Sequence, residues 1–106
     1  MYIRIQENTI RYRVSKLEAK QLINEEILEQ SLVISPSHTL NYAINLTQHD
    51  NQFNYEETSN KLLLAINRDI LIKELEQRPS KRGIVFNQYF KDKIIGVSLE
   101  IDLKNK

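Results

Sequence analysis

The first fourteen residues alternate between apolar and polar side chains, and this alternation constrains the fold more than any other feature of the chain. The apolar positions are Ile3, Ile5, Ile10, Tyr12 and Val14. A period of two residues is typical of a β-strand that buries one face. Glu7-Asn8 can form the turn of a hairpin, because asparagine tolerates a positive φ. That turn would place Ile5 opposite Ile10 and Arg4 opposite Arg11, so that the apolar residues share one face.

Ser15-Lys16-Leu17-Glu18 follows the predicted hairpin directly and has the pattern of a helix capping box. In this motif the serine hydroxyl accepts a hydrogen bond from a free helix amide, and the glutamate accepts one from the serine amide. We expect a short helix whose buried stripe consists of Leu17, Leu22 and Ile23. The stretch Asn24-Glu25-Glu26 should end it.

Strand and helix signals continue to the end of the chain. We expect a second helix that Asp69 caps and Pro79 ends, and strands at residues 27–34, 40–46, 62–66, 84–86 and 97–103. The polar residues 47–58 predict the longest loop, anchored by Phe53 and Tyr55. The resulting order is ββαβββαββ. We therefore predict one α+β domain over residues 1–106, with a largely antiparallel, strongly curved sheet and two short helices.

Charge and composition argue against several functional classes. The 15 basic and 14 acidic side chains leave a formal net charge of +1, so no overall field favours nucleic acid or an anionic membrane. The basic residues Arg78, Lys81 and Arg82 are diluted by nearby acidic side chains, which argues against nucleic-acid binding.

The chain has no cysteine, which excludes disulfides and thiolate catalysis. No apolar run fits a signal peptide or a bilayer span, so we expect a cytoplasmic protein without membrane contact, and no cofactor is predicted.

Arg4, Arg11 and Arg13 fall on one face of the predicted hairpin. Arginines directly opposite each other repel unless an anionic group lies nearby. One interpretation is a site that binds the phosphate or carboxylate of a ligand or partner, because a guanidinium contacts two oxygens of such groups. The other is an internal ion-pair ladder with Glu100 and Asp102, which forms if the last strand lies beside the hairpin.

The residues Glu100-Ile101-Asp102-Leu103-Lys104 superficially resemble the acid-x-acid-x-lysine strand of triphosphate tunnel enzymes. That resemblance implies the alternative function of a small metal-dependent phosphohydrolase, with Glu100 and Asp102 as metal ligands. The motif lies at the opposite end of the chain from its place in that family. The chain is also too short to supply the full ring of strands.

Interaction with another protein chain is the remaining functional class. The alternating strand Leu40 to Leu46 can pair with a second copy or with another protein if it lies at a sheet edge. If it lies in the centre of a sheet, it cannot. We expect a non-enzymatic cytosolic binding or protein-interaction domain, acting as a homodimer or with a protein partner, with the three arginines as its anion contact.

The N-terminal residues resemble the opening of a known family. They are Met1-Tyr2-Ile3-Arg4-Ile5, Asn8, Ile10-Arg11-Tyr12-Arg13-Val14 and Ser15-Lys16-Leu17-Glu18. Together they are similar to a family of small bacterial proteins of comparable length that is known only as a domain of unknown function. Family members often have a glycine near the helix end, where Glu26 or Ile27 stands in this chain. The resemblance implies a single cytosolic domain and does not indicate any activity, because none is assigned to the family.

Overall fold

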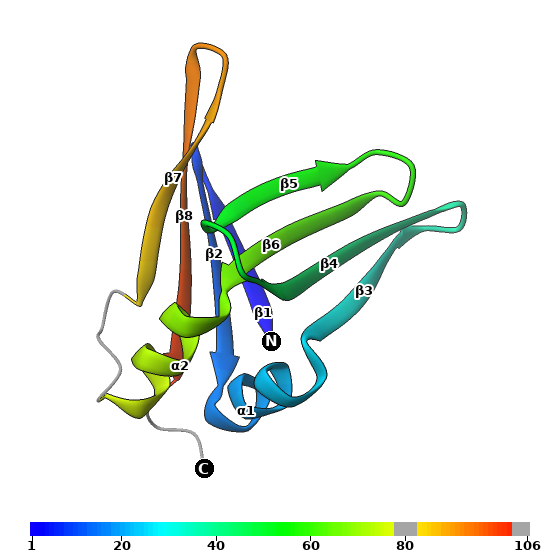
Figure 1. Ribbon diagram of the computed structural model, residues 1–106. Helices are drawn as coiled ribbons and strands as arrows, with labels where there is room; N and C mark the ends of the chain where they lie inside the picture. Colours follow the sequence, from blue (N-terminus) through cyan, green and yellow to red (C-terminus); the bar gives the residue numbers. More distant parts are fainter. Residues whose placement is uncertain (78–82, 103–106) are drawn as a thin grey trace.

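Eight strands and two helices follow one another in the computed structural model, which describes residues 1–77 and 83–102 (Figure 1). They are β1 (Tyr2–Gln6), β2 (Thr9–Ser15), α1 (Lys16–Glu25), β3 (Ile27–Ser35), β4 (His38–Thr47), β5 (Gln52–Glu56), β6 (Lys61–Asn67), α2 (Arg68–Glu76), β7 (Ile84–Phe90) and β8 (Lys93–Asp102). The α+β class, the two short helices and the largely antiparallel pairing are confirmed. The order ββαββββαββ has one strand more than predicted.

The additional strand is β5, so the prediction of one long loop at residues 47–58 is wrong. β5 pairs antiparallel with β6 and places Phe53 opposite Leu64. The ring of Phe53 is 5% exposed, and Asn54 between the two aromatic residues faces outward. Burial of this ring outweighs the low strand propensity of the surrounding asparagine and glutamine residues.

The strands form two sheets where the sequence predicts a single curved one. Sheet A has the order β1-β2-β8-β7, and sheet B has the order β3-β4-β6-β5. The hairpins at the edges are antiparallel, whereas the central pairs β2/β8 and β4/β6 are parallel. The sequence allows the strand at residues 40–46 to lie either at the edge or in the centre of a sheet. In the structure these residues lie in β4, between β3 and β6, so the strand is central.

The predicted N-terminal hairpin is present with the predicted register. Ile5 lies opposite Ile10, and Arg4 lies opposite Arg11. Asn8 in the turn has a φ of 58°, a left-handed conformation that asparagine adopts more readily than most residues.

Helix α1 begins and ends where the sequence predicts. The Ser15 hydroxyl accepts from the Glu18 amide at 3.0 Å, and the Glu18 carboxylate accepts from the Ser15 amide at 2.9 Å. The helix ends at Glu26, whose φ of 69° is of the kind that glycine usually adopts. The prediction for Leu17 is wrong, because its side chain is 68% exposed and Ala19 is buried instead.

Helix α2 is capped two residues earlier than predicted. The Asn67 side chain, and not that of Asp69, accepts from the Ile70 amide at 3.1 Å. Pro79, which should end this helix, lies outside the described residues, as do Leu103 and Lys104 at the end of the last predicted strand.

The two halves of the chain repeat one ββαββ arrangement, which no sequence repeat reveals. Each half gives its first hairpin to one sheet and its second hairpin to the other. In this repeat β2 corresponds to β6 and β8 to β4, and each helix starts directly after β2 or β6, at the N-caps Ser15 and Asn67.

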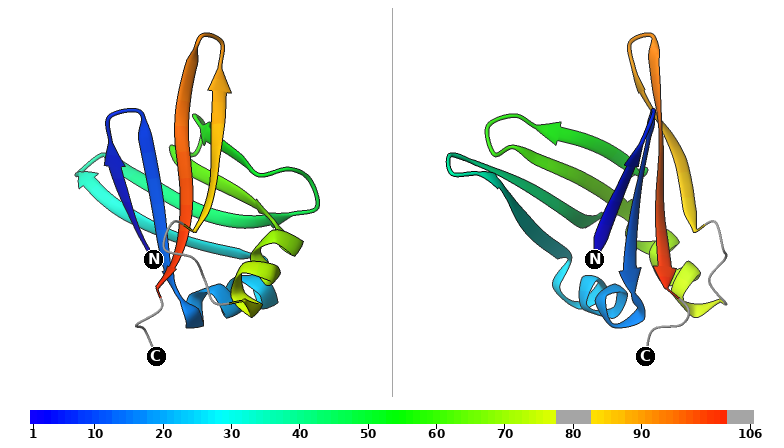
Figure 2. Two further views of the ribbon diagram at one scale, coloured as in Figure 1. Left: turned by 90° about the vertical axis from the view of Figure 1, so that its left-hand side faces the viewer. Right: turned by 180° about the vertical axis from the view of Figure 1, so that it is seen from behind.

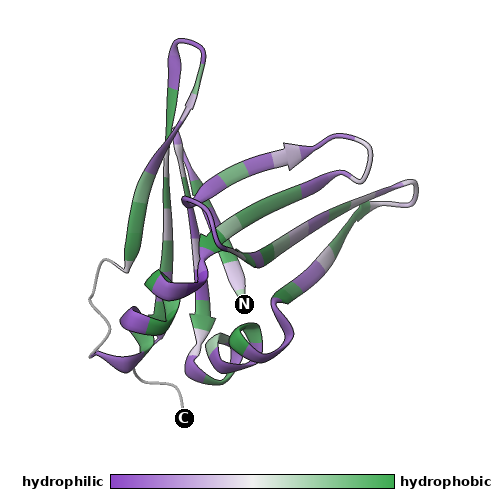
Figure 3. Cartoon of the chain, viewed as in Figure 1, coloured by the Kyte–Doolittle hydropathy of each residue, from purple (hydrophilic) through white to green (hydrophobic). Residues whose placement is uncertain are grey.

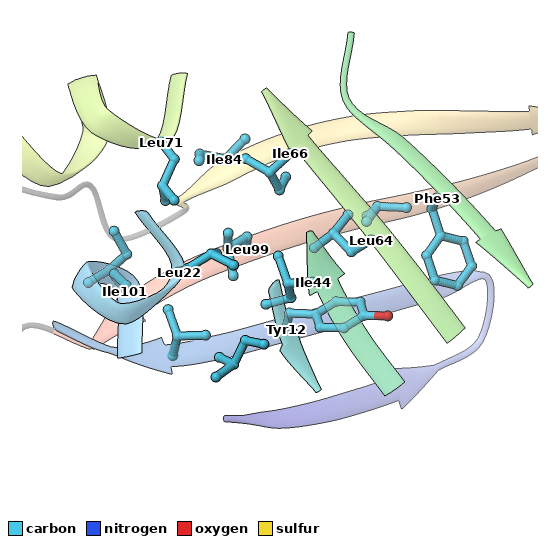
Figure 4. Close-up of a cluster of buried hydrophobic side chains, with 14 of the residues drawn as sticks. Tyr12, Leu22, Ile44, Phe53, Leu64, Ile66, Leu71, Ile84, Leu99 and Ile101 are labelled. Atoms are coloured by element: carbon cyan, nitrogen blue, oxygen red, sulfur yellow. The ribbon is translucent and has the colours of Figure 1, made fainter. Parts of the chain in front are cut away.

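The apolar faces of the two sheets meet in one core, which the helices cover at one end (Figure 4). Apolar and polar bands alternate along most strands (Figure 3). Tyr12 is fully buried, packs edge-to-face on Phe53 with ring centroids 6.5 Å apart, and donates its hydroxyl to the Leu62 carbonyl at 3.2 Å. Burial raises the pKa of this phenol. Away from the core, the hairpin tips of sheet B point away from sheet A (Figure 2).

Candidate functional site

The three arginines lie on the outer face of sheet A, opposite to the core. Arg4 is on β1, whereas Arg11 and Arg13 are on β2. Strand β8 runs parallel to β2 and places Ser98 beside Arg11 and Glu100 beside Arg13. We call this surface, from Tyr2, Arg4 and Gln6 across to Ser98, Glu100 and Asp102, the arginine face.

Two of the arginines form the predicted ion pairs with the last strand. Arg11 Nε lies 3.2 Å from Glu100 Oε2, and Arg13 Nη2 lies 3.7 Å from Asp102 Oδ1. Arg13 also donates to the Tyr2 hydroxyl at 3.0 Å, and this hydrogen bond raises the pKa of its guanidinium. The internal ladder therefore exists, and it leaves more than half of the Arg11 side chain, 54%, exposed.

Arg4 differs from the other two arginines. It is exposed, lies directly opposite Arg11, and has no carboxylate within ion-pair distance in residues 1–77 and 83–102. Like charges at directly opposite positions of an antiparallel pair destabilise it. The three arginines and two carboxylates of the arginine face thus leave one positive charge that the described part of the chain does not neutralise.

A groove of about 480 Å³ lies on the same face and contains Arg11. Its lining comes from all four strands of sheet A: Gln6, Thr9, Ile10, Arg11, Val85, Gly96, Val97, Ser98 and Glu100. Thr9, Ser98 and Gln6 give it neutral hydrogen-bonding groups beside the guanidinium. Gly96 also lines the groove, and the Gly96 amide donates to the Asn8 carbonyl at 2.9 Å, which joins β8 to the β1/β2 turn.

The two carboxylates proposed as metal ligands are each engaged with a guanidinium, which competes with a cation for their oxygens. Within the described ranges, no three histidine or acidic side chains gather closely enough to hold a metal ion. The two sheets are open at β1, β7, β3 and β5, so sheets A and B do not form a ring. Arg78, Lys81 and Arg82 lie outside the described residues.

Because the two halves of the chain repeat one arrangement, the charged positions of sheet A can be compared with the equivalent positions of sheet B. On sheet B the positions equivalent to Arg11 and Arg13 are Leu63 and Ala65. The residue beside Ala65 is Asn45, where sheet A has Glu100. Sheet B has an ion pair elsewhere on its outer face, between Lys61 and Glu29 at 3.3 Å, but none at the equivalent positions. The same backbone arrangement thus forms without these charges.

Sequence reasoning identified the arginines but missed the groove. Gln6 and Thr9 share the arginine face by the hairpin register, so the alternation alone could have indicated them. Gly96 and Ser98 join the groove only because β8 runs parallel to β2. That pairing joins segments more than 80 residues apart, and no local pattern predicts it.

The chain belongs to a family of unknown function, DUF7009, whose model matches residues 1–104. This is the kind of family that the N-terminal residues resemble. No curated protein and no solved structure is detectably similar to the chain. Neither α1 nor α2, the helices of the described residues, is long and apolar enough to cross a membrane.

Proposed function

We propose that this domain is a binding module that holds an anionic group, a phosphate or a carboxylate, on the arginine face of sheet A. The observation that carries the proposal is the contrast between the two halves of the chain. Sheet B has the same strand arrangement with Leu63 and Ala65 where sheet A has Arg11 and Arg13. The fold therefore does not require these charges, and their presence on one sheet supports a role in binding.

The chemistry of the face suits an oxyanion. Arg4 supplies a guanidinium that has no carboxylate partner among residues 1–77 and 83–102, and guanidinium groups bind phosphate and carboxylate through two parallel hydrogen bonds. Arg11 already binds one carboxylate, that of Glu100, at 3.2 Å. In the proposed complex the ligand anion takes the place of this carboxylate. We infer that a ligand anion displaces Glu100 from Arg11 and bridges Arg11 and Arg4. The hydroxyl groups of Thr9 and Ser98 line the groove next to it.

Anion titrations of matched variants test the proposal. Binding of phosphate, citrate and nucleoside triphosphates would be measured by calorimetry and by the shift in melting temperature. Arg4→Ala should weaken binding about tenfold, the equivalent of one charged hydrogen bond. Glu100→Gln should strengthen it, because the competing carboxylate is lost. Lys61→Ala, which removes a basic side chain from the outer face of sheet B, is the control and should bind as the wild type does.

Arg4→Ala and Glu100→Gln should change the affinity for anions in opposite directions, which distinguishes anion binding from a purely structural ion-pair ladder. If the ladder is only structural, Glu100→Gln lowers stability and no anion raises the melting temperature of any variant, and the proposal is then wrong. A magnesium series belongs in the same experiment, because stabilisation by Mg²⁺ that Glu100→Gln abolishes would favour the metal-dependent alternative instead. The proposal retains the cytosolic location expected from the sequence.

A further inference from the structure

Gly96 is a glycine that the fold itself does not require. It lies within β8, does not have a positive φ, and a Cβ there would lie 3.4 Å from the nearest atom of the described residues, Thr9 Cγ2, which is ordinary van der Waals contact. Gly83, in contrast, needs glycine both for its φ of 71° and for its close approach to β8. A glycine in the interior of a strand weakens the strand and often marks a place where a ligand approaches the backbone closely. Gly96 lines the groove of the arginine face, so a ligand bound in this groove would contact it.

The space above Gly96 is a narrow slot between two uncharged side chains, and we call it the Gly96 slot. Thr9 lies beside Gly96 on β2, and Asn87 lies opposite it on β7. A Cβ at Gly96 would lie 3.4 Å from Thr9 Cγ2 and 4.0 Å from Asn87 Oδ1, and atoms in van der Waals contact are about 3.5–4.0 Å apart. The Thr9 hydroxyl donates to the Gln6 carbonyl at 3.3 Å, and its methyl group faces the slot. The slot therefore holds one layer of atoms between an apolar wall and an amide.

The Gly96 slot lies close to the arginines. Along β8, Gly96 is two residues from Ser98, which lies beside Arg11. Neighbouring strands are about 4.8 Å apart and each residue advances about 3.3 Å, so the Cα atoms of Gly96 and Arg11 are about 8 Å apart. On the other side of Ser98 lies Val85, whose side chain is 50% exposed. The groove thus combines a charged end at Arg11, an uncharged slot at Gly96 and an apolar wall at Val85.

We propose that the anion bound on the arginine face is carried by a flat heteroaromatic ring, which inserts into the Gly96 slot between Thr9 and Asn87. This inference rests on the proposed anion binding and adds the chemical class of the ligand. The groove has the necessary size, because its volume of about 480 Å³ lies in the range of small-molecule sites. A ring is one layer of atoms thick, as the slot requires.

A ring suits the slot better than an alkyl chain, which is also one layer of atoms thick. A chain would cover the Asn87 amide and the Ser98 hydroxyl without offering them hydrogen bonds, and covering polar groups in this way is costly. Nitrogen and oxygen atoms at the edge of a ring can bond to both groups. The ring must be joined to its oxyanion directly or through a short linker such as a sugar, because the slot lies only about 8 Å from Arg11.

Pairs of compounds that share an oxyanion and differ in the ring test this inference by calorimetry. Uridine 5′-monophosphate is compared with ribose 5-phosphate, and nicotinate with acetate. Whichever oxyanion the arginines bind, the member with the ring should bind about tenfold more tightly, a typical effect of stacking one ring. Equal binding within each pair that binds rejects the ring and leaves the anion site standing, whereas no binding of any compound rejects both proposals. Hexyl phosphate that binds as tightly as uridine 5′-monophosphate assigns the slot to an apolar chain and also overturns the ring.

Gly96→Ala tests the slot directly, because its methyl group occupies the space that the ring requires. The measured quantity is the ratio of the two affinities within the pair that binds. Gly96→Ala should lower this ratio about tenfold, to near one, and keep the melting temperature within a few degrees of that of the wild type. Arg4→Ala should weaken both members equally and preserve the ratio, and Lys61→Ala, outside the groove, should change neither affinity. A Gly96→Ala variant that keeps the wild-type ratio, or that weakens both members alike, overturns the inference.

Discussion

Gly83, which directly precedes β7, should be the position most sensitive to the addition of one methyl group. Its φ is 71°, and a Cβ built there would lie 2.2 Å from the Leu99 carbonyl oxygen of β8. The left-handed conformation costs an L-residue about 1–2 kcal/mol. Relieving the clash requires β7 to move away from β8, and overpacking of this kind typically costs about 1–3 kcal/mol. Gly83→Ala should therefore lower the free energy of unfolding by about 2–5 kcal/mol, a large part of the stability of a small domain.

Urea unfolding followed by circular dichroism measures this loss, and Gly96→Ala is the control. Gly96 lies within β8, does not have a positive φ, and a Cβ there would lie 3.4 Å from the nearest atom, Thr9 Cγ2. Alanine in a strand interior loses less chain entropy on folding than glycine, so Gly96→Ala should change stability by less than about 1 kcal/mol. If Gly83→Ala is as stable as Gly96→Ala, the conformation assigned to residue 83 and the reasoning from it are incorrect.

Two further substitutions test contacts that fix the helix start and the core. Partial burial alone would raise the pKa of Glu18, but the Met1 ammonium and the Ser15 amide outweigh burial and lower it. Glu18→Gln keeps the capping contact but loses the ion pair with the Met1 ammonium, so it should cost about 1 kcal/mol at neutral pH. Urea titrations at several pH values should show this difference shrinking as the pH falls from the ordinary pKa of a glutamate through the lowered pKa of the folded wild-type carboxylate. Tyr12→Phe removes the buried hydrogen bond to the Leu62 carbonyl and should cost about 0.5–1.5 kcal/mol in the same assay without changing the fold. An unchanged stability for either variant would contradict the contact concerned.

Local features of this fold were predictable because short-range physics determines them. The hairpin register follows from the positions of Ile5 and Ile10 around a turn that asparagine favours. The start of α1 follows from the hydrogen bonds between Ser15 and Glu18. Each of these features depends on residues at most twelve positions apart, where alternation and capping carry the information.

Features that depend on distant segments were not predictable. β5 is a strand because Phe53 is buried against β6, and polar residues around it hide that role in the sequence. Leu17 was expected in the core, but burial on a short helix depends on which strands it packs against. The candidate site divides in the same way. The arginines are visible in the hairpin, whereas the groove needs the β2/β8 pairing.

The internal repeat separates what the fold requires from what it only permits. Positions that are equivalent in the two halves and buried in both carry apolar side chains: Tyr12 and Leu64, Val14 and Ile66, Ala19 and Leu71. These residues form the core, so folding requires an apolar side chain at them in both halves. The outer positions are not constrained in this way, because Arg13 on one sheet corresponds to Ala65 on the other. Exposed ion pairs contribute at most about 1 kcal/mol, so folding alone gives little reason to keep three arginines on sheet A. Their presence on one sheet alone is what the proposed anion binding accounts for.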